Sequence, residues 1–120
     1  MTDKPKIIIC DDEEGVRESL RLIIERDYEP IPASDGATAL DKLNEDAEIK
    51  AVLLDIKMPK LTGLEILKLI KQTHPHMPVI MITGYQTAEL AAEAIKLGAL
   101  DYIIKPINSA AVLASLGKAI

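Results

Sequence analysis

Short apolar runs alternate with longer amphipathic segments along this chain, and they do so five times in succession. Runs of this length that are rich in β-branched residues predict β-strands. The five runs are KIIIC (6–10), YEPIPA (28–33), AVLLD (51–55), PVIMIT (78–83) and DYIIK (101–105).

The segments between and after these runs repeat apolar residues at helical spacing, which predicts five helices. Ser34 or Asp35 can cap the second helix, and Gly98 can end the fourth in the left-handed conformation. The expected helices cover 14–26, a stretch from 34 or 35 onward, about 64–72, 87–97 and 108–120.

Five successive strand–helix units predict a parallel sheet, because parallel neighbours need crossover helices and right-handed crossovers place helices on both faces. Pro30 and Pro32 interrupt the second run. Proline cannot donate a ladder hydrogen bond, so this strand is expected at a sheet edge. The sequence therefore predicts one doubly wound α/β domain over residues 1–120, with strand order 2-1-3-4-5 and a binding site where strands one and three diverge.

Polar residues follow the apolar runs where the strands end. Asp11 and Asp12 follow the first strand, Asp55 ends the third run, Thr83 ends the fourth, and Lys105 ends the fifth. The carboxyl ends of parallel strands share one edge of a sheet, so these side chains are expected to converge there.

The expected cluster has a defined chemistry. Three neighbouring carboxylates raise one another's pKa unless a cation relieves them. Oxygen ligands without His or Cys suit a hard ion, and few carboxylates favour Mg²⁺ over Ca²⁺. Mg²⁺ with a lysine and a hydroxyl neutralises a transferring phosphoryl group, and a carboxylate beside them can be the nucleophile. Asp55 is the candidate nucleophile.

Four stretches in the same order and spacing resemble the receiver domain of two-component response regulators: IIICDDEE, VLLDIKMPKLTGLE, PVIMITG and GALDYIIKPI. The resemblance covers essentially the whole chain and implies a flavodoxin-like fold. The last stretch is similar to receivers of the sigma-54-activator type.

The resemblance implies a role for each site residue. Asp55 would accept a phosphoryl group from a phosphohistidine of a sensor histidine kinase or phosphotransfer protein. Asp11 and Asp12 would form the acid pocket for Mg²⁺, with Asp12, Asp55 and the backbone carbonyl of Lys57 as direct ligands. Thr83 would hydrogen-bond one phosphoryl oxygen.

The resemblance also implies a conformational switch. Lys105 would pair with a second phosphoryl oxygen, and a cis bond before Pro106 would aim it into the site. Thr83 would move toward the phosphoryl group while Tyr102 turns inward. The face made by helix four, strand five and helix five would then change its contacts with an output domain, a downstream protein or a second copy of the chain.

Several residues also have simpler interpretations. Asp11 and Asp12 suit the N-terminus of the first helix through its dipole. Thr83 alone is an ordinary strand-end hydroxyl, and Tyr102 alone is a strand aromatic with one exposed edge. Gly84, Lys57 and Tyr85 occupy positions that tune access to the phosphoryl group and its lifetime in the family, and the sequence does not set that lifetime.

Other classes of protein fit less well. A flavin-phosphate binder would be repelled by DDEEG (11–15), and no nucleotide-binding glycine motif occurs. A haloacid-dehalogenase-type phosphatase places its second aspartate two residues after its nucleophile, whereas Asp11 and Asp12 are adjacent. The remaining alternative is a pseudo-receiver that acts only as a dimerisation or interaction module.

Composition agrees with an intracellular signalling domain. The net charge of −5 argues against a nucleic-acid surface. The single cysteine, Cys10, lies in an apolar run and reads as a buried thiol in a reducing compartment. No segment is long and apolar enough to span a membrane, so a cytoplasmic location is expected. The last helix is still apolar at Ile120, which favours a receiver cut from a larger regulator.

Overall fold

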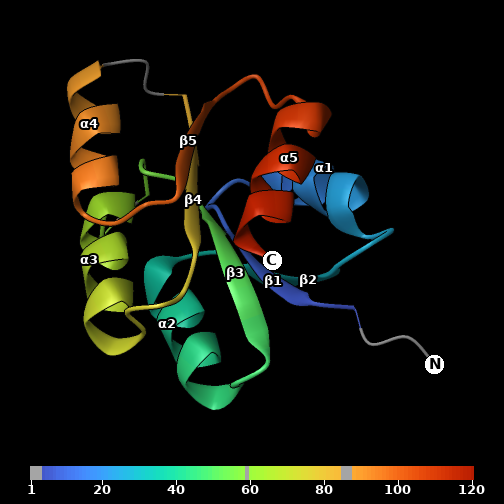
Figure 1. Ribbon diagram of the computed structural model, residues 1–120, viewed down its shortest axis with the longest axis horizontal. Coiled ribbons are helices and arrows are strands. Elements are labelled where there is room, and N and C mark those ends of the chain that lie inside the picture. Colours follow the sequence, from blue (N-terminus) through green and yellow to red (C-terminus); the bar gives the residue numbers. More distant parts are fainter. Residues whose placement is uncertain (1–3, 59, 85–87) are drawn as a thin grey trace.

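Five parallel strands in the order β2-β1-β3-β4-β5 form the centre of the computed structural model, which describes residues 4–58, 60–84 and 88–120 (Figure 1). This is the predicted flavodoxin-like order. Strands and helices alternate along the chain as β1 (Lys6–Cys10), α1 (Glu14–Ile24), β2 (Glu29–Ala33), α2 (Gly36–Glu45), β3 (Ile49–Leu54), α3 (Gly63–Thr73), β4 (Val79–Thr83), α4 (Ala88–Lys96), β5 (Asp101–Ile104) and α5 (Ser109–Ala119).

The proline-containing strand β2 lies at one edge of the sheet, as predicted. The backbone N–H of Glu29 donates to the carbonyl of Pro5 at 2.9 Å, so this residue faces β1. Backbone groups alternate in direction along a strand, and the nitrogens of Pro30 and Pro32 therefore face the free edge. The missing N–H groups cost the sheet no internal hydrogen bond.

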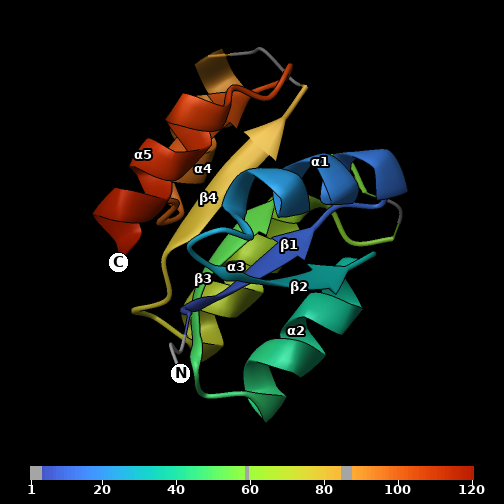
Figure 2. The same cartoon turned by 90° about the vertical axis from the view of Figure 1, so that its right-hand side faces the viewer.

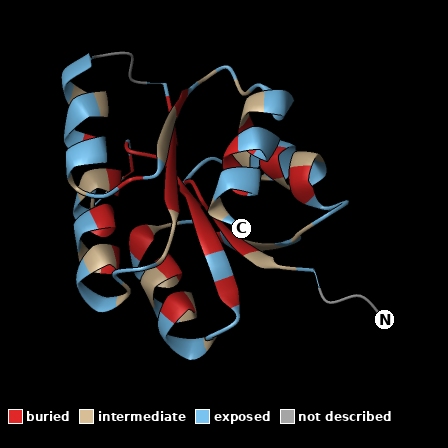
Figure 3. Cartoon of the chain, viewed as in Figure 1, coloured by how far each residue is buried: buried red, intermediate tan, exposed pale blue. Residues whose placement is uncertain are grey.

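Helices cover both faces of the sheet (Figure 1). Helices α2, α3 and α4 pack against one face, through buried residues that include Leu43, Ile66 and Ala94. Helices α1 and α5 pack against the other, through Leu20 and Leu116 among others. Figure 2 shows α1 and α5 in front of the sheet, and Figure 3 shows buried positions concentrated on the central strands.

The strands read as continuous apolar runs because both of their faces are covered. In β1, Ile8 and Cys10 point toward the α2–α3–α4 face, while Ile7 and Ile9 point toward the α1–α5 face. Burial raises the pKa of the Cys10 thiol to about 12, with a smaller contribution from the charge of Asp11. Cys10 is a free, buried thiol, as the sequence indicated.

Helix ends follow local capping chemistry. Asp35, one of the two proposed caps of α2, accepts a hydrogen bond from the Thr38 N–H at 2.8 Å. Gly98 has a φ of 108° where the chain leaves α4, as expected for a left-handed cap. Asn108 caps α5 by accepting from the Ala111 N–H. The expected start of α4 at Thr87 lies outside the described residues.

Helix boundaries differ from the prediction by one or two residues. Helix α1 ends at Ile24 rather than 26. Helix α3 begins at Gly63, behind a capping box in which Thr62 and Glu65 each accept from the other's backbone N–H. The T-x-x-E spacing of Thr62 and Glu65 was the signal for that start. Among the described residues, no helix has both the length and the apolar character needed to cross a membrane.

Candidate functional site

Acidic residues from two neighbouring strands meet at the carboxyl edge of the sheet. The Asp55 N–H donates to the carbonyl of Cys10 at 3.0 Å, which extends the ladder between β1 and β3 beyond both strands. One carboxylate oxygen from each of Asp11, Asp12 and Asp55 lies within 4.8 Å of the other two. The strand order thus brings together acids that are far apart in sequence.

The members of this cluster differ in exposure. Asp11 and Asp55 are 2% and 4% exposed, whereas Asp12 faces solvent. Lys105, just after β5, reaches across the edge. Its Nζ lies 3.2 Å from Oδ2 of Asp11 and 3.6 Å from Oδ2 of Asp55. One ammonium therefore contacts two of the three carboxylates.

The surroundings of Asp55 shift the pKa of its carboxyl. Burial, followed by the nearby charge of Asp11, raises the pKa of the Asp55 carboxyl above its ordinary value. Three partners oppose this rise without cancelling it. They are the charge of Lys105, a hydrogen bond with the Thr83 side chain, and the Ile56 N–H, which donates to Oδ1 at 2.8 Å. Asp55 is thus partnered but incompletely neutralised.

Lys105 shows the complementary effect. Burial lowers the pKa of its ammonium, but the charges of Asp11 and Asp55 more than compensate, so the pKa stands above its ordinary value. The bond between Lys105 and Pro106 is cis, as the resemblance implied. The Lys105 N–H donates to the Thr83 carbonyl at 2.8 Å, which ties the chain after β5 to the end of β4.

An open pocket of about 440 Å³ gives access to this cluster. Lys57 and Gly84 are exposed at its wall, and a Cβ added to Gly84 would meet no atom within 4 Å. Tyr85, a further residue expected to tune the site, lies outside the described residues. The pocket is lined by Asp12, Glu13, Asp55, Lys57, Thr83, Gly84 and Lys105.

Tyr102 lies on β5, near the cluster but outside the pocket lining. Its half-buried ring packs against the apolar cluster on the α2–α3–α4 face. Burial and, to a smaller extent, the charge of Asp55 raise the pKa of its phenol. The hydroxyl of Tyr102 is thus within electrostatic reach of the acidic cluster.

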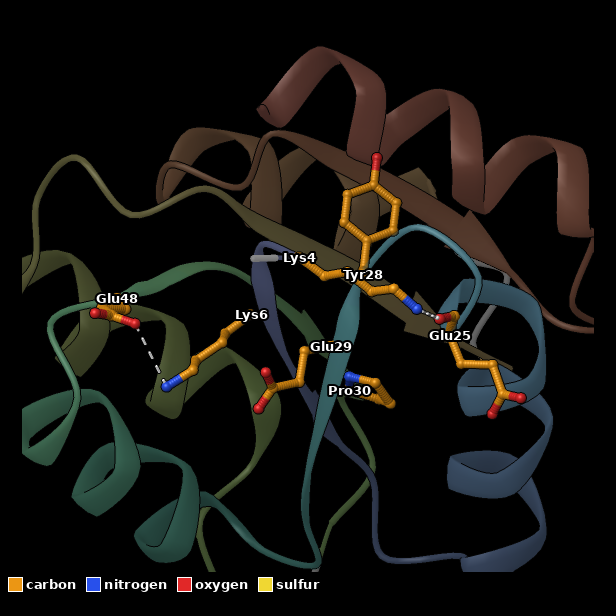
Figure 4. A pocket seen from close by; sticks show the side chains of 7 residues that line it. All are labelled: Lys4, Lys6, Glu25, Tyr28, Glu29, Pro30 and Glu48. Carbon is orange, nitrogen blue, oxygen red and sulfur yellow. Dashed lines mark hydrogen bonds and ion pairs between the residues drawn. The ribbon is translucent and has the colours of Figure 1, made fainter. Parts of the chain in front are cut away.

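A second hollow, of about 390 Å³, lies at the opposite end of the sheet (Figure 4). Its lysines already have protein partners: Lys6 pairs with Glu48 at 3.7 Å, and Lys4 donates to the Glu25 carbonyl at 2.9 Å. Acidic and basic residues are mixed in its lining, and the metal-binding grouping of three carboxylates lies at the carboxyl edge instead. We therefore take the carboxyl edge as the candidate site.

Two contributors to the site were not identified from the sequence. The Arg17 guanidinium donates through Nη1 to the backbone carbonyl of Asp11 at 2.6 Å. Gly63 packs so closely under the loop after β3 that a Cβ there would overlap the carbonyl oxygen of Asp55. Both contacts depend on tertiary placement, because the sequence shows only a polar helix position and a helix-start glycine.

The donor set suits a hard divalent cation. Its side chains offer carboxylate oxygens, and the Lys105 ammonium contacts two of the three carboxylates. Asp11, Asp12 and Asp55 are the residues placed to hold such an ion. A nucleophilic carboxylate, a hydroxyl and an ammonium beside them are the groups that phosphoryl transfer uses.

Comparison with known proteins defines the class. The family model of the response regulator receiver domain matches residues 7–117. A crystal structure of a receiver domain protein from Clostridium thermocellum superposes with a TM-score of 0.90 and 36% identity, covering 96% of this chain and 93% of that one. The chain belongs to the response regulator receiver family.

Curated relatives include longer regulators. The transcriptional regulatory protein FixJ of Azorhizobium caulinodans is 34% identical over 97% of this chain and 55% of its own length. A putative NtrX-like response regulator of Rickettsia bellii is 42% identical over 86% of this chain and 22% of its own. The chain thus spans less than two thirds of either relative. The NtrX-like match agrees with the resemblance to sigma-54-activator receivers.

Proposed function

We propose that this domain is the phosphoacceptor switch of a two-component phosphorelay, with Asp55 as the acceptor. The observation that carries the proposal is the contact of Lys105 Nζ with both Asp11 and Asp55, at 3.2 and 3.6 Å, inside a cluster of three carboxylates. If Lys105 were only a surface lysine and the aspartates only helix caps, their side chains would not be expected to make contact across the edge of the sheet.

The transfer uses one carboxylate oxygen of Asp55 as nucleophile. This oxygen attacks the phosphorus of a phosphohistidine on a sensor histidine kinase or phosphotransfer protein. An O–P bond forms, the P–N bond breaks, and the imidazole nitrogen leaves with the electron pair and takes up a proton from solvent. The product is an aspartyl-phosphate, with Thr83 and Lys105 assigned to its phosphoryl oxygens. The domain is an acceptor that assists this reaction rather than an independent enzyme.

Mg²⁺ is the proposed cofactor. Asp11, Asp12 and Asp55 would hold it, with the Lys57 carbonyl as a further ligand, and when bound it neutralises charge on the carboxylates and the phosphoryl oxygens. A solved complex supports the assignment by likeness: CheX–CheY–BeF3–Mg²⁺ from Borrelia burgdorferi contains a chain 30% identical to this one, with a TM-score of 0.88.

The proposed output is a change at the face of α4, β5 and α5. Thr83 would move toward the phosphoryl group, with Tyr102 turning further inward. Apolar side chains exposed on and beside these elements support a role in binding an output domain, a downstream protein or a second copy of the chain: Ile95, Leu100, Ile104 and Leu113. Nucleic acid and membrane are not proposed as partners of this domain. The free thiol of Cys10 agrees with the proposed cytoplasmic location.

A pseudo-receiver that only mediates interactions is the alternative. Its surface would work without chemistry at Asp55, so Asp55→Ala would leave signalling intact. The buried, incompletely neutralised carboxylate favours the phosphoacceptor, because an interaction module gains nothing from the cost of burying it.

Phosphotransfer from a histidine kinase tests the proposal. A kinase carrying labelled phosphohistidine is mixed with the domain and Mg²⁺, and label is followed on both proteins. The proposal predicts label on this domain in an alkali-labile linkage, lost in Asp55→Asn but retained in the control Asp41→Asn on α2. Failure of transfer from every kinase tried, together with signalling by Asp55→Ala, would establish the alternative.

A further inference from the structure

Arg17 links helix α1 to the loop that carries two of the three acids. It is the fourth residue of the helix, and its Nη1 donates to the backbone carbonyl of Asp11 at 2.6 Å. The contact reaches back six residues, which is farther than hydrogen bonds within a helix. Arg17 is half-buried, and the contact is partly buried.

The bonded carbonyl belongs to the peptide unit that joins Asp11 to Asp12. Peptide units are planar, so a hydrogen bond to this oxygen restrains the orientation of the plane from which the Asp12 side chain leaves the backbone. Asp12 itself is exposed, and protein packing holds it weakly. The orientation of this peptide therefore influences where its carboxylate lies relative to Asp55.

Other contacts hold the first half of the loop. The Asp11 N–H donates to the Ala33 carbonyl at 3.1 Å, and Oδ1 of Asp11 accepts from the Glu13 N–H at 2.9 Å. Glu13, the N-cap residue of α1, makes no side-chain capping bond. Arg17 thus supplies a bond from the body of the helix to the peptide between the two aspartates.

We propose that Arg17 is a positioning residue, which holds the Asp11–Asp12 peptide in the orientation that divalent-cation binding needs. This inference rests on the proposed function of the site. Supporting groups around metal ligands commonly change affinity by about 10–100-fold when removed. Arg17 differs from such groups because it carries the same sign of charge as the cation.

That sign separates positioning from simple electrostatics. If Arg17 only balanced the acidic cluster, its removal would reduce repulsion and strengthen Mg²⁺ binding. If it positions the loop, removal weakens binding even though a repelling charge is gone. The two explanations predict opposite changes in the same measured constant.

The test compares Arg17→Met with Arg21→Met. Both variants remove one positive charge from α1 and keep an apolar stem, but Arg21 pairs with Glu18 and Glu25 on the helix surface. Calorimetric titration with Mg²⁺ should give a Kd about tenfold higher for Arg17→Met and an unchanged Kd for Arg21→Met. A Kd for Arg17→Met equal to or below the wild-type value would overturn the inference.

Hydrogen exchange of the metal-free protein provides a readout independent of metal. The amides of residues 12–14 should exchange faster in Arg17→Met than in wild type or Arg21→Met, with the sheet amides unchanged. Should Arg17→Met fail to fold, Arg17→Gln provides the same comparison, because it removes the charge and replaces the guanidinium with a shorter donor. A Kd for Arg17→Gln equal to or below the wild-type value would overturn the inference, and a higher Kd would support it.

The controls separate this inference from the proposed function. Wild-type protein that binds no Mg²⁺ would contradict the function of the site. If wild-type protein and Arg17→Met bind Mg²⁺ with equal affinity, the proposed function stands and only the role of Arg17 is contradicted.

Discussion

Nζ of Lys105 lies 3.2 Å from Oδ2 of Asp11, although the two residues are 94 positions apart in the chain. The contact joins the loop after β5 to the loop after β1 across the carboxyl edge of the sheet. It places a positive charge next to the acidic cluster, so the lysine and a divalent cation compete for the same negative field.

Removal of Lys105 should therefore strengthen metal binding. We expect Lys105→Met to lower the Mg²⁺ Kd about fivefold, corresponding to about 1 kcal/mol for a partly exposed ion pair. Lys118→Met is the matched control, because Lys118 on α5 forms an ion pair with Asp101 at 3.2 Å, away from the acidic cluster. Weaker Mg²⁺ binding by Lys105→Met would show that the lysine does not offset the carboxylates.

The same variant tests coupling between the site and the surface. Lys105→Met should still accept a phosphoryl group at Asp55 but should lose the change at the α4–β5–α5 face. Amide chemical shifts of that face, recorded before and after phosphorylation, distinguish the two properties. Wild-type shift changes in the phosphorylated variant would remove Lys105 from the switch.

The raised pKa of Asp55 predicts a pH dependence of stability. In the metal-free protein, burial and Asp11 raise this pKa, whereas the unfolded chain keeps the ordinary value near 3.8. At a pH between the unfolded and folded pKa values, the folded protein binds more protons at Asp55 than the unfolded chain does. Ionisation of this carboxyl therefore lowers the free energy of unfolding as the pH rises through that range, and the loss persists at higher pH.

Asp55→Asn removes that ionisation. Its free energy of unfolding in metal-free buffer should exceed the wild-type value at pH 7, and the difference should shrink as the pH falls toward 3.8. Urea titrations at several pH values measure it, with Asp41→Asn as the control. A variant less stable than wild type at pH 7, or a gain that grows on acidification, would contradict the assigned cause.

Two glycines should respond oppositely to the same substitution. A Cβ at Gly63 would overlap the Asp55 carbonyl, so Gly63→Ala must displace the loop beside the acceptor and should cost about 1–3 kcal/mol, as overpacking does. A Cβ at Gly117 in α5 meets nothing within 4 Å, so Gly117→Ala should stabilise the protein by about 0.5–1 kcal/mol. Equal stability of the two variants, measured by urea denaturation, would contradict this account of Gly63.

Much of the fold was predictable because local patterns and the global arrangement agree. The continuous apolar runs predicted buried parallel strands, and Pro30 and Pro32 predicted the edge position that β2 occupies. The strand order then predicted which polar residues share an edge. The start of α3 was missed by one residue although Thr62 and Glu65 carry the capping-box spacing.

Contacts made by backbone atoms were not predictable. Arg17 reads as one polar residue on an amphipathic helix, and its bond to the Asp11 carbonyl depends on where the helix starts relative to β1. Gly63 reads as a helix-start glycine, and its approach to Asp55 depends on how the loop after β3 closes. The type of residue at a position does not predict its distance from a backbone atom elsewhere in the fold.

Phosphorylation of Asp55 is the central claim, and intact-mass spectrometry after incubation with Mg²⁺ and acetyl phosphate tests it most directly. The account predicts the gain of one hydroxylamine-labile phosphoryl group, absent from Asp55→Asn and from wild-type protein in chelator. A phosphoryl group that persists in Asp55→Asn would contradict the assignment of this residue, and no gain from either acetyl phosphate or a phosphorylated histidine kinase would contradict the switch itself.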